Sequence, residues 1–256
     1  MTFSADLTAC AALVQAADPD RFLSVMAAPV AARRVLFPIY ALNVEIARAP
    51  WVTQESMIAE MRLQWWRDAL SEIATGGPVR RHEVVTPLAE ILTAELAAEA
   101  DEMIAVRRWD IYSDPFEDEA HLDRYLDQSA GTLMWIAARS LGDADETALR
   151  DAGYAMGLAN WFRAIPQLEA RGRIPLLDGS LAGVQALAQI GLGRLNRARE
   201  VGFGRTVRPA VLAGWQSETI LKQVIADPAR VAAGKLGTSE ARKRLNLMSK
   251  TLFGRI

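Results

Sequence analysis

Apolar residues recur at helical spacing along most of the chain. In the segment TQESMIAEMRLQWWRDALSEIA, five residues share one helix face because three or four positions separate each from the next: Ile58, Met61, Trp65, Ala69 and Ile73. Residues 35–49 are largely apolar, and no segment shows the strict alternation of a half-buried strand. The pattern therefore predicts an all-α protein.

Turn-forming residues divide this pattern into helical blocks. Thr53 is placed to cap the helix of the quoted segment, and Gly76-Gly77-Pro78 ends that helix. Further helices are predicted over residues 86–108, 119–141, 147–162, 184–202, 208–226 and 240–252. No internal repeat or low-complexity linker interrupts the series, so we expect a single domain over residues 1–256.

Two glycines lie inside the block at residues 147–162. Gly153 and Gly157 each cost about 1 kcal/mol in a helix relative to alanine. Such a pair indicates either close backbone packing or an open cavity beside the helix.

Composition limits the compartment and the class of protein. At 256 residues and 51% apolar content, the chain can bury a large core. Its single cysteine, Cys10, allows no intramolecular disulfide. The first residues carry no basic segment before an apolar run, and no apolar stretch approaches the roughly 20 residues of a membrane span. We expect a cytoplasmic protein that is neither exported nor membrane-spanning and that makes peripheral contact with the inner membrane.

Charge is distributed unevenly, although the formal net charge is only -2. Residues 1–190 contain 16 Lys and Arg against 27 Asp and Glu, whereas residues 191–256 contain 13 against 4. The basic C-terminal quarter favours an acidic partner or an anionic membrane surface. Nucleic acid is not expected, because the chain has neither an RNA-binding motif with interleaved aromatic residues nor a helix-turn-helix pattern.

The last helical block has an amphipathic pattern of its own. An apolar stripe is flanked by basic residues: the stripe contains Leu245, Met248, Leu252 and Ile256, and the basic residues are Arg242, Lys243, Arg244 and Lys250. The pattern fits a helix lying on an anionic membrane, and it equally fits a final core helix with a basic outer face. Either arrangement leaves the basic excess available for peripheral membrane contact.

Three fragments carry a resemblance to a known family. They are RLQWWRDAL at residues 62–70, LDRYLDQSAGTL at residues 122–133 and GLANWFRAIPQLEARGRIPLL at residues 157–177. In this order, and over nearly the whole chain, they resemble the squalene and phytoene synthases. The resemblance implies an isoprenoid-synthase-like helical bundle around a central cavity. In active members of that family, two aspartate-rich motifs bind magnesium and ionise an allylic diphosphate.

The acidic positions of both motifs hold other residues here. In the second motif they fall on Ala164 and Leu168, and an ungapped alignment of residues 38–52 places those of the first motif on Ala47, Arg48 and Trp51. Magnesium takes oxygen ligands, and an arginine facing such a site would repel it. We therefore expect neither a metal nor another cofactor, and we assign no catalytic residue.

Several charged or polar residues of the two motif regions remain as candidates. For anion or ligand binding these are Glu45, Arg62, Asn160, Arg163, Arg171 and Arg173. Guanidinium groups can hold an anion without a metal. His82 and His121 lack partners at metal-ligand spacing, so a zinc site is not expected.

The sequence NVEIA followed by RLQWWRDAL is similar to a divergent branch of the family that lacks the aspartate motifs. That branch contains the mitochondrial factor required for assembly of respiratory complex I. The resemblance implies a non-catalytic pseudoenzyme that contacts a membrane-complex subunit or an assembly intermediate. Two alternatives stay open: a prenyltransferase that condenses isoprenoid diphosphates, and a non-catalytic protein that binds an isoprenoid or another lipid.

Overall fold

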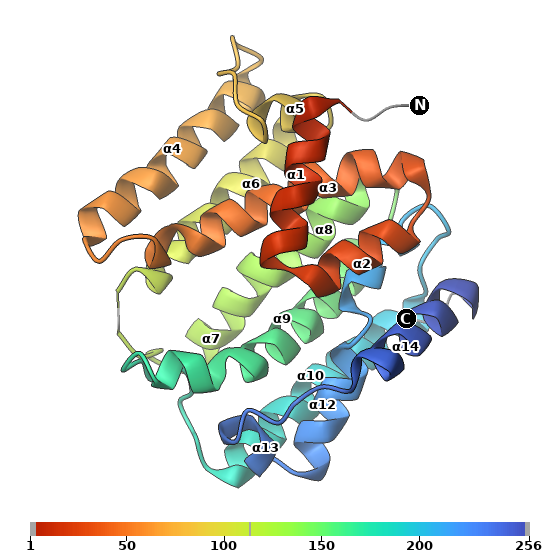
Figure 1. The fold of residues 1–256 in the computed structure, drawn as a ribbon. Coiled ribbons are helices and arrows are strands. Elements are labelled where there is room, and N and C mark those ends of the chain that lie inside the picture. Colours follow the sequence, from red (N-terminus) through yellow and green to blue (C-terminus); the bar gives the residue numbers. More distant parts are fainter. Residues whose placement is uncertain (1–3, 113, 254–256) are drawn as a thin grey trace.

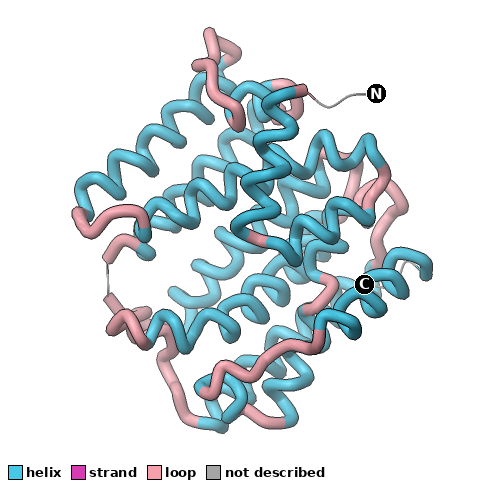
Figure 2. The backbone as a smooth tube through the Cα atoms, in the orientation of Figure 1, coloured by secondary structure: helices cyan, strands magenta, loops and turns pink. Residues whose placement is uncertain are grey.

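The computed structural model describes residues 4–112 and 114–253, and every regular element in these ranges is helical (Figures 1 and 2). The α-helices are α1 (Ala5–Ala17), α2 (Pro19–Ala27), α3 (Val30–Arg48), α4 (Ser56–Thr75), α5 (Val85–Ala89), α6 (Ala94–Val106), α7 (Glu119–Leu126), α8 (Thr132–Arg139), α9 (Glu146–Glu169), α10 (Leu181–Val201), α11 (Arg208–Val211), α12 (Ser217–Ala226), α13 (Ala229–Ala232) and α14 (Glu240–Phe253). The shorter elements are the 3-10 helices η1 (Ala49–Trp51), η2 (Arg107–Asp110) and η4 (Leu212–Gly214), and the π-helix η3 (Asp127–Gly131). The all-α prediction is confirmed.

Helix α9 joins the two halves of the molecule. Its first turns, with Leu149 and Ala152, pack in an apolar cluster formed mainly by α3, α4, α6 and α8. Its later turns, with Leu158 and Phe162, pack in a second cluster formed mainly by α7, α10 and α12. Figure 1 shows α9 between these two groups of helices. A change in α9 therefore affects both clusters.

The glycines of α9 permit close packing against η3. A β-carbon added at Gly153 would lie 2.6 Å from the carbonyl oxygen of Ala130 and 2.8 Å from the α-carbon of Gly131. One added at Gly157 would lie 2.5 Å from the β-carbon of Ala130. All three distances are shorter than real β-carbon contacts, so the two glycines let the helices approach. Of the two explanations for this pair, close packing accounts for Gly153, and Gly157 both packs closely and lines a cavity.

Some predicted helix boundaries are wrong, because local side-chain hydrogen bonds override the periodic pattern. The block at residues 86–108 is broken between α5 and α6, where the Thr93 hydroxyl accepts the Leu96 N–H at 3.3 Å and starts a new helix. Thr53 does not cap α4, since its hydroxyl accepts the Glu55 N–H at 3.1 Å and the helix begins at Ser56. The predicted end of α4 is confirmed at Gly76, whose φ of 66° is left-handed.

The apolar face that the spacing marks on α4 is only partly buried. Ala69 and Ile73 are buried, but Ile58, Met61 and Trp65 are exposed, with Met61 at 66%. The helix carries a neighbouring apolar stripe, which shares Ala69 and Ile73 with the first and packs on the core: Ala59, Leu63, Trp66, Ala69, Leu70 and Ile73. Periodicity alone does not show which of two neighbouring stripes is the inner one.

Helix α14 turns its predicted apolar stripe toward solvent. Leu245, Met248 and Leu252 are 65%, 59% and 76% exposed, whereas Leu247 is buried against Leu212 and Trp215. The alternative in which this stripe packs on the core is therefore wrong for these three residues, and Ile256 lies outside the described residues. No helix in the described ranges is long and apolar enough to cross a membrane.

Candidate functional site

The predicted motif positions meet around a cavity of about 240 Å³. This central cavity lies among α2, α3, η2, η3 and α9, and its lining includes Ala47, Trp51, Asn160, Ala164 and Leu168. Asn160, Ala164 and Leu168 share one face of α9 because they are four residues apart. The structure thus brings together residues more than 100 positions apart in the sequence, as an arrangement of two facing motifs requires.

Arg48 is the exception among the aligned acidic positions. It is not among the residues that line the central cavity, and its guanidinium pairs with Glu45 on the exposed side of α3 at 3.3 Å. The expectation that Arg48 faces a metal site is wrong. Successive helical residues point about 100° apart, so Ala47 faces the cavity while Arg48 points away from it.

The three arginines of the second motif are engaged by other protein groups. Arg163 pairs with Asp20 at 3.2 Å. Arg171 and Arg173 lie over the ring of Trp51, at 4.5 and 5.0 Å from its centre, and Arg173 also donates to the Tyr112 carbonyl at 2.7 Å. None of the three lines the central cavity. Arg163 is thus held by Asp20 of α2, and Arg171 and Arg173 are held against Trp51.

Other polar residues, which the sequence did not single out, line the central cavity. They are Arg21, Asn43, Arg107, Asp110, Tyr125 and Ser129. Asn43 could have been found, because it precedes Ala47 by four residues and so lies on the same face of α3. Arg21 follows the cap of α2, where Asp18 accepts its backbone N–H at 3.0 Å, and the sequence gives no sign that its side chain turns inward.

Arg107, Asp110 and Tyr125 form a hydrogen-bonded network in the cavity wall, in which only Nε of Arg107 is buried without a partner. The Tyr125 hydroxyl donates to Asp110 at 2.7 Å, and Arg107 donates to the Tyr125 oxygen at 2.9 Å and pairs with Asp110 at 3.2 Å. Burial raises the pKa of Tyr125, which keeps the phenol neutral. Asp110, the one carboxylate that lines the central cavity, is thus fully engaged by its neighbours.

These residues do not fit a magnesium–diphosphate cluster. Magnesium requires oxygen ligands in near-octahedral geometry. Ala47, Ala164 and Leu168 have no side-chain oxygen, and Asp110 already accepts from two partners. In the described part of the chain, no group of three or more His, Cys, Asp or Glu side chains is placed to hold a metal ion.

Glu45 and Arg62 lie at a different place, in a groove beside α4. This groove, the α3–α4 groove, has a volume of about 440 Å³ and is lined by Glu45, Ile58, Met61, Arg62, Trp65, Trp66 and His82. Trp65 is held in place there, because its ring meets Trp66 edge-on at 4.8 Å and Arg80 lies over it at 4.9 Å. The exposed stripe of α4 therefore presents ordered apolar side chains.

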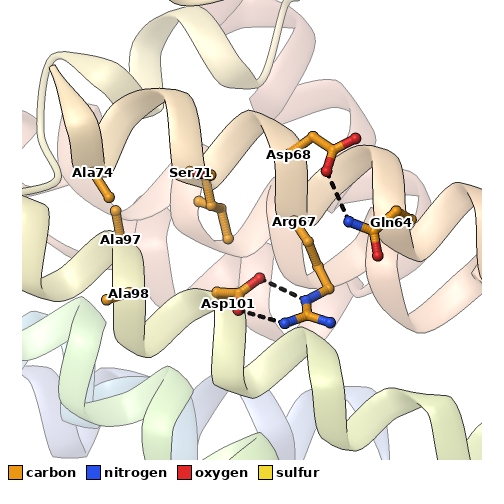
Figure 3. A pocket seen from close by; sticks show the side chains of 9 residues that line it. Gln64, Arg67, Asp68, Ser71, Ala74, Ala97, Ala98 and Asp101 are labelled. Atoms are coloured by element: carbon orange, nitrogen blue, oxygen red, sulfur yellow. Dashed lines mark hydrogen bonds and ion pairs between the residues drawn. The ribbon is translucent and has the colours of Figure 1, made fainter. Parts of the chain in front are cut away.

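A third hollow, of about 380 Å³, lies between α4 and α6 (Figure 3). In this α4–α6 hollow, Arg67 donates to both oxygens of Asp101, at 2.7 and 2.8 Å, and Gln64 donates to Asp68 at 2.7 Å. Its most prominent polar side chains thus pair with one another, and small residues such as Ala97 form much of the floor. This arrangement is that of a structural contact between two helices.

The fold and the facing motif positions define an all-α protein of the isoprenoid-synthase type. Residues 14–178 match the family described as squalene/phytoene synthase, and the chain belongs to that family. Its fold matches the crystal structure of a dehydrosqualene synthase in complex with ligand, with a TM-score of 0.75, 15% identity, and coverage of 98% of this chain and 96% of that one. At this identity, the match establishes the fold alone.

The chain is also distantly related to complex I assembly factor 6. It is 27% identical over 189 residues to the Drosophila melanogaster homolog, covering 70% of this chain and 56% of that protein. It is 21% identical over 196 residues to the Homo sapiens protein, covering 75% of this chain and 59% of that protein. The chain thus spans little more than half the length of these relatives.

Proposed function

We propose that this protein is a non-catalytic assembly factor for respiratory complex I or a related inner-membrane complex. The observation that carries the proposal is the chemistry of the facing positions in the central cavity, where Ala47 on α3 meets Ala164 and Leu168 on α9. Ionisation of an allylic diphosphate depends on metal ions that neutralise the leaving group, and these side chains offer such ions no ligand. The lining of the cavity therefore supports a role other than prenyl transfer.

The distant relationship to complex I assembly factor 6 supports the assembly role. The expected partner is then a subunit of the membrane complex or an assembly intermediate. The exposed stripe of α4, with Met57, Ile58, Met61 and Trp65, provides a surface of the kind that proteins use for each other. An ordered tryptophan beside flexible methionines is typical of such contacts.

Deletion of the gene in its host tests the assembly role. We expect less assembled complex I on native gels, with succinate oxidation by the membranes unchanged, and recovery when the wild-type protein is re-expressed. A Met61→Ser/Trp65→Ser variant should not restore the complex, whereas the matched α10 variant Leu181→Ser/Ile190→Ser, also at exposed apolar residues, should restore it. Normal complex I levels after deletion would exclude this function.

We further propose that α14 contacts an anionic membrane surface. Its exposed stripe of Leu245, Met248 and Leu252 has Arg242 and Arg244 on either side, both also exposed. Lys243 and Lys250 lie on the protein side instead: Lys243 pairs with Asp20 at 3.4 Å, and burial lowers the pKa of Lys250. Apolar insertion and the two arginines together favour peripheral binding.

Sedimentation with liposomes tests the membrane contact. Binding should rise with the fraction of anionic lipid and fall with salt, because each basic residue near the surface contributes about 1 kcal/mol before screening. A Leu245→Gln/Met248→Gln/Leu252→Gln variant should bind less, and the α10 variant Leu181→Gln/Ile190→Gln/Val201→Gln should bind as the wild type does. Binding that ignores both salt and lipid charge would rule the contact out.

A further inference from the structure

The exposed stripe of α4 borders the α3–α4 groove along its length. Met57 and Met61 are 73% and 66% exposed, and Ile58 and Trp65 are exposed as well. From Met57 to Trp65 the stripe rises about 12 Å, at about 1.5 Å per residue, which is about two helical turns. Figure 1 shows α4 at the edge of the molecule. A row of exposed apolar side chains of this length is typical of an interaction surface.

One wall of the groove is ordered without any partner. The ring of Trp65 contacts those of Trp66 and His82, with 4.8 and 5.1 Å between ring centres. Arg80 donates to the Trp65 carbonyl at 3.2 Å and is itself held by Glu72 at 2.6 Å. A tryptophan that is already fixed loses little conformational freedom on binding, so Trp65 is suited to anchor a partner.

The chemistry of the lining favours a helical occupant. Ile58 and Met61 offer a peptide backbone no strong hydrogen-bond partner. Every regular element in residues 4–112 and 114–253 is helical, so these ranges contain no sheet edge that could pair with an extended segment. A helix satisfies its own backbone groups, and it can place apolar side chains at three- and four-residue spacing along two turns of α4.

Arg62 gives the groove an unmatched positive charge. The carboxylate of Glu45 pairs with Arg48 at 3.3 Å, and the Glu45 side chain is only 13% exposed. Arg62 lines the same groove and is exposed, and it forms no ion pair or hydrogen bond within the described ranges. An acidic residue on the occupant would complement this charge, and a basic residue would be repelled.

We propose that the α3–α4 groove binds an amphipathic helix of a partner protein, with apolar residues of that helix against Met61 and Trp65 and an acidic residue against Arg62. The inference rests on the proposed assembly role for the identity of the partner, and it adds the chemistry that the partner presents. Helix α14, the proposed membrane contact, lies at the opposite edge of the molecule from α4 (Figure 1). A membrane at α14 therefore leaves the groove accessible to a protein.

Photo-cross-linking in the host tests the occupant. The full chain would carry p-benzoylphenylalanine in place of Met61, and a matched chain would carry it in place of Leu181, which is similarly exposed on α10. We expect an adduct at position 61 and not at position 181. Mass spectrometry should place the cross-linked peptide in an amphipathic helix, with Asp or Glu within one turn of the attachment site. A lipid adduct, a second copy of this chain, a segment without an acidic residue, or no adduct above the control would overturn the proposal.

Charge variants locate the contact at Arg62. Arg62→Glu should lower the yield of the position-61 adduct by about tenfold or more, because like charges would then face each other, whereas Arg62→Lys should retain it. Arg34→Glu on α3 is the matched control and should leave the yield unchanged, since Arg34 is also exposed and has no ion pair within the described ranges. Equal yields from Arg62→Glu and Arg34→Glu would overturn the assignment of Arg62.

The same experiment separates this inference from the assembly role. An adduct with an acidic amphipathic helix of a protein unrelated to complex I would support the groove as a helix-binding site and contradict the assembly role. Loss of complex I on deletion of the gene, without such an adduct at position 61, would support the assembly role and overturn the inference.

Discussion

The central cavity and the α4–α6 hollow contrast in how their polar groups are paired. In the hollow, Arg67 gives two hydrogen bonds to Asp101, and the arginine edge is used within the protein (Figure 3). In the smaller central cavity, Arg21 and Asn43 each keep a buried atom without a partner. The larger hollow therefore has its polar groups paired within the protein, whereas the smaller cavity keeps buried polar atoms unpaired.

The largest effect is expected where α9 packs against the cavity wall. Gly153→Ala should lower the free energy of unfolding by about 3 kcal/mol, because the new methyl group meets backbone atoms of Ala130 and Gly131 that cannot move aside cheaply. Urea denaturation of the two proteins measures the difference.

Gly193 provides the matched control for that substitution. It also lies inside a helix, α10, but a β-carbon there would meet no atom within 4 Å. Gly193→Ala should therefore raise stability by up to about 1 kcal/mol through helix propensity alone. A loss at Gly193 comparable to that at Gly153 would show that close packing is not the cause.

A smaller effect is expected at the ion pair that holds Arg21 in the cavity wall. Arg21 holds the pKa of Asp18 below its ordinary value even though burial opposes this, so the charged carboxylate stabilises the fold. Asp18→Asn should lower the free energy of unfolding by about 1.5 kcal/mol at pH 7, while asparagine still caps α2.

The pH dependence of that loss follows from the direction of the shift. A depressed folded-state pKa contributes stability above the unfolded value of about 3.9, and the contribution disappears as pH falls through the folded-state pKa. The difference between wild type and Asp18→Asn should therefore be constant above about pH 5 and shrink below about pH 4. A difference that persists undiminished at pH 2 would assign the loss to something other than this charge.

The smallest effect is expected in the α4–α6 hollow. A double-mutant cycle of Arg67→Ala and Asp101→Ala should give a coupling of about 0.5–1 kcal/mol, because the pair is partly exposed and screened by solvent. A coupling well above this range would contradict the description of the pair as a solvent-screened contact.

The all-α fold could be predicted because apolar residues recur at helical spacing through most of the chain. The break at Thr93 and the late start of α4 at Ser56 could not, since each depends on one side-chain hydrogen bond that competes with the helix. The periodic pattern also could not show which face of α4 is buried, because two apolar stripes on one helix are equivalent until a neighbouring helix covers one of them.

The sequence predicted part of the candidate site. Ala47, Ala164 and Leu168 could be placed on facing helices from the family resemblance, and they line the central cavity. The sequence could not show that Arg21 turns inward, because helix α2 is short and its direction is set by packing against distant segments such as η4. Nor could it show that Arg163 is held by Asp20, 143 positions earlier.

The lining of the central cavity also predicts the effect of placing aspartates in the second motif. Ala164→Asp/Leu168→Asp should remain inactive as a prenyltransferase, because Ala47 still faces them from α3 without a carboxylate. The reason is this missing ligand and not Arg48, which points away from the cavity.

Turnover of prenyl diphosphates tests the central claim most directly. Purified protein would be incubated with farnesyl or geranylgeranyl diphosphate and Mg²⁺, and the organic extract analysed by mass spectrometry beside a sample without protein. The side chains at positions 47, 164 and 168 supply no metal ligand, so we expect no condensation product above that control. A squalene-like or phytoene-like product above the control would contradict the account.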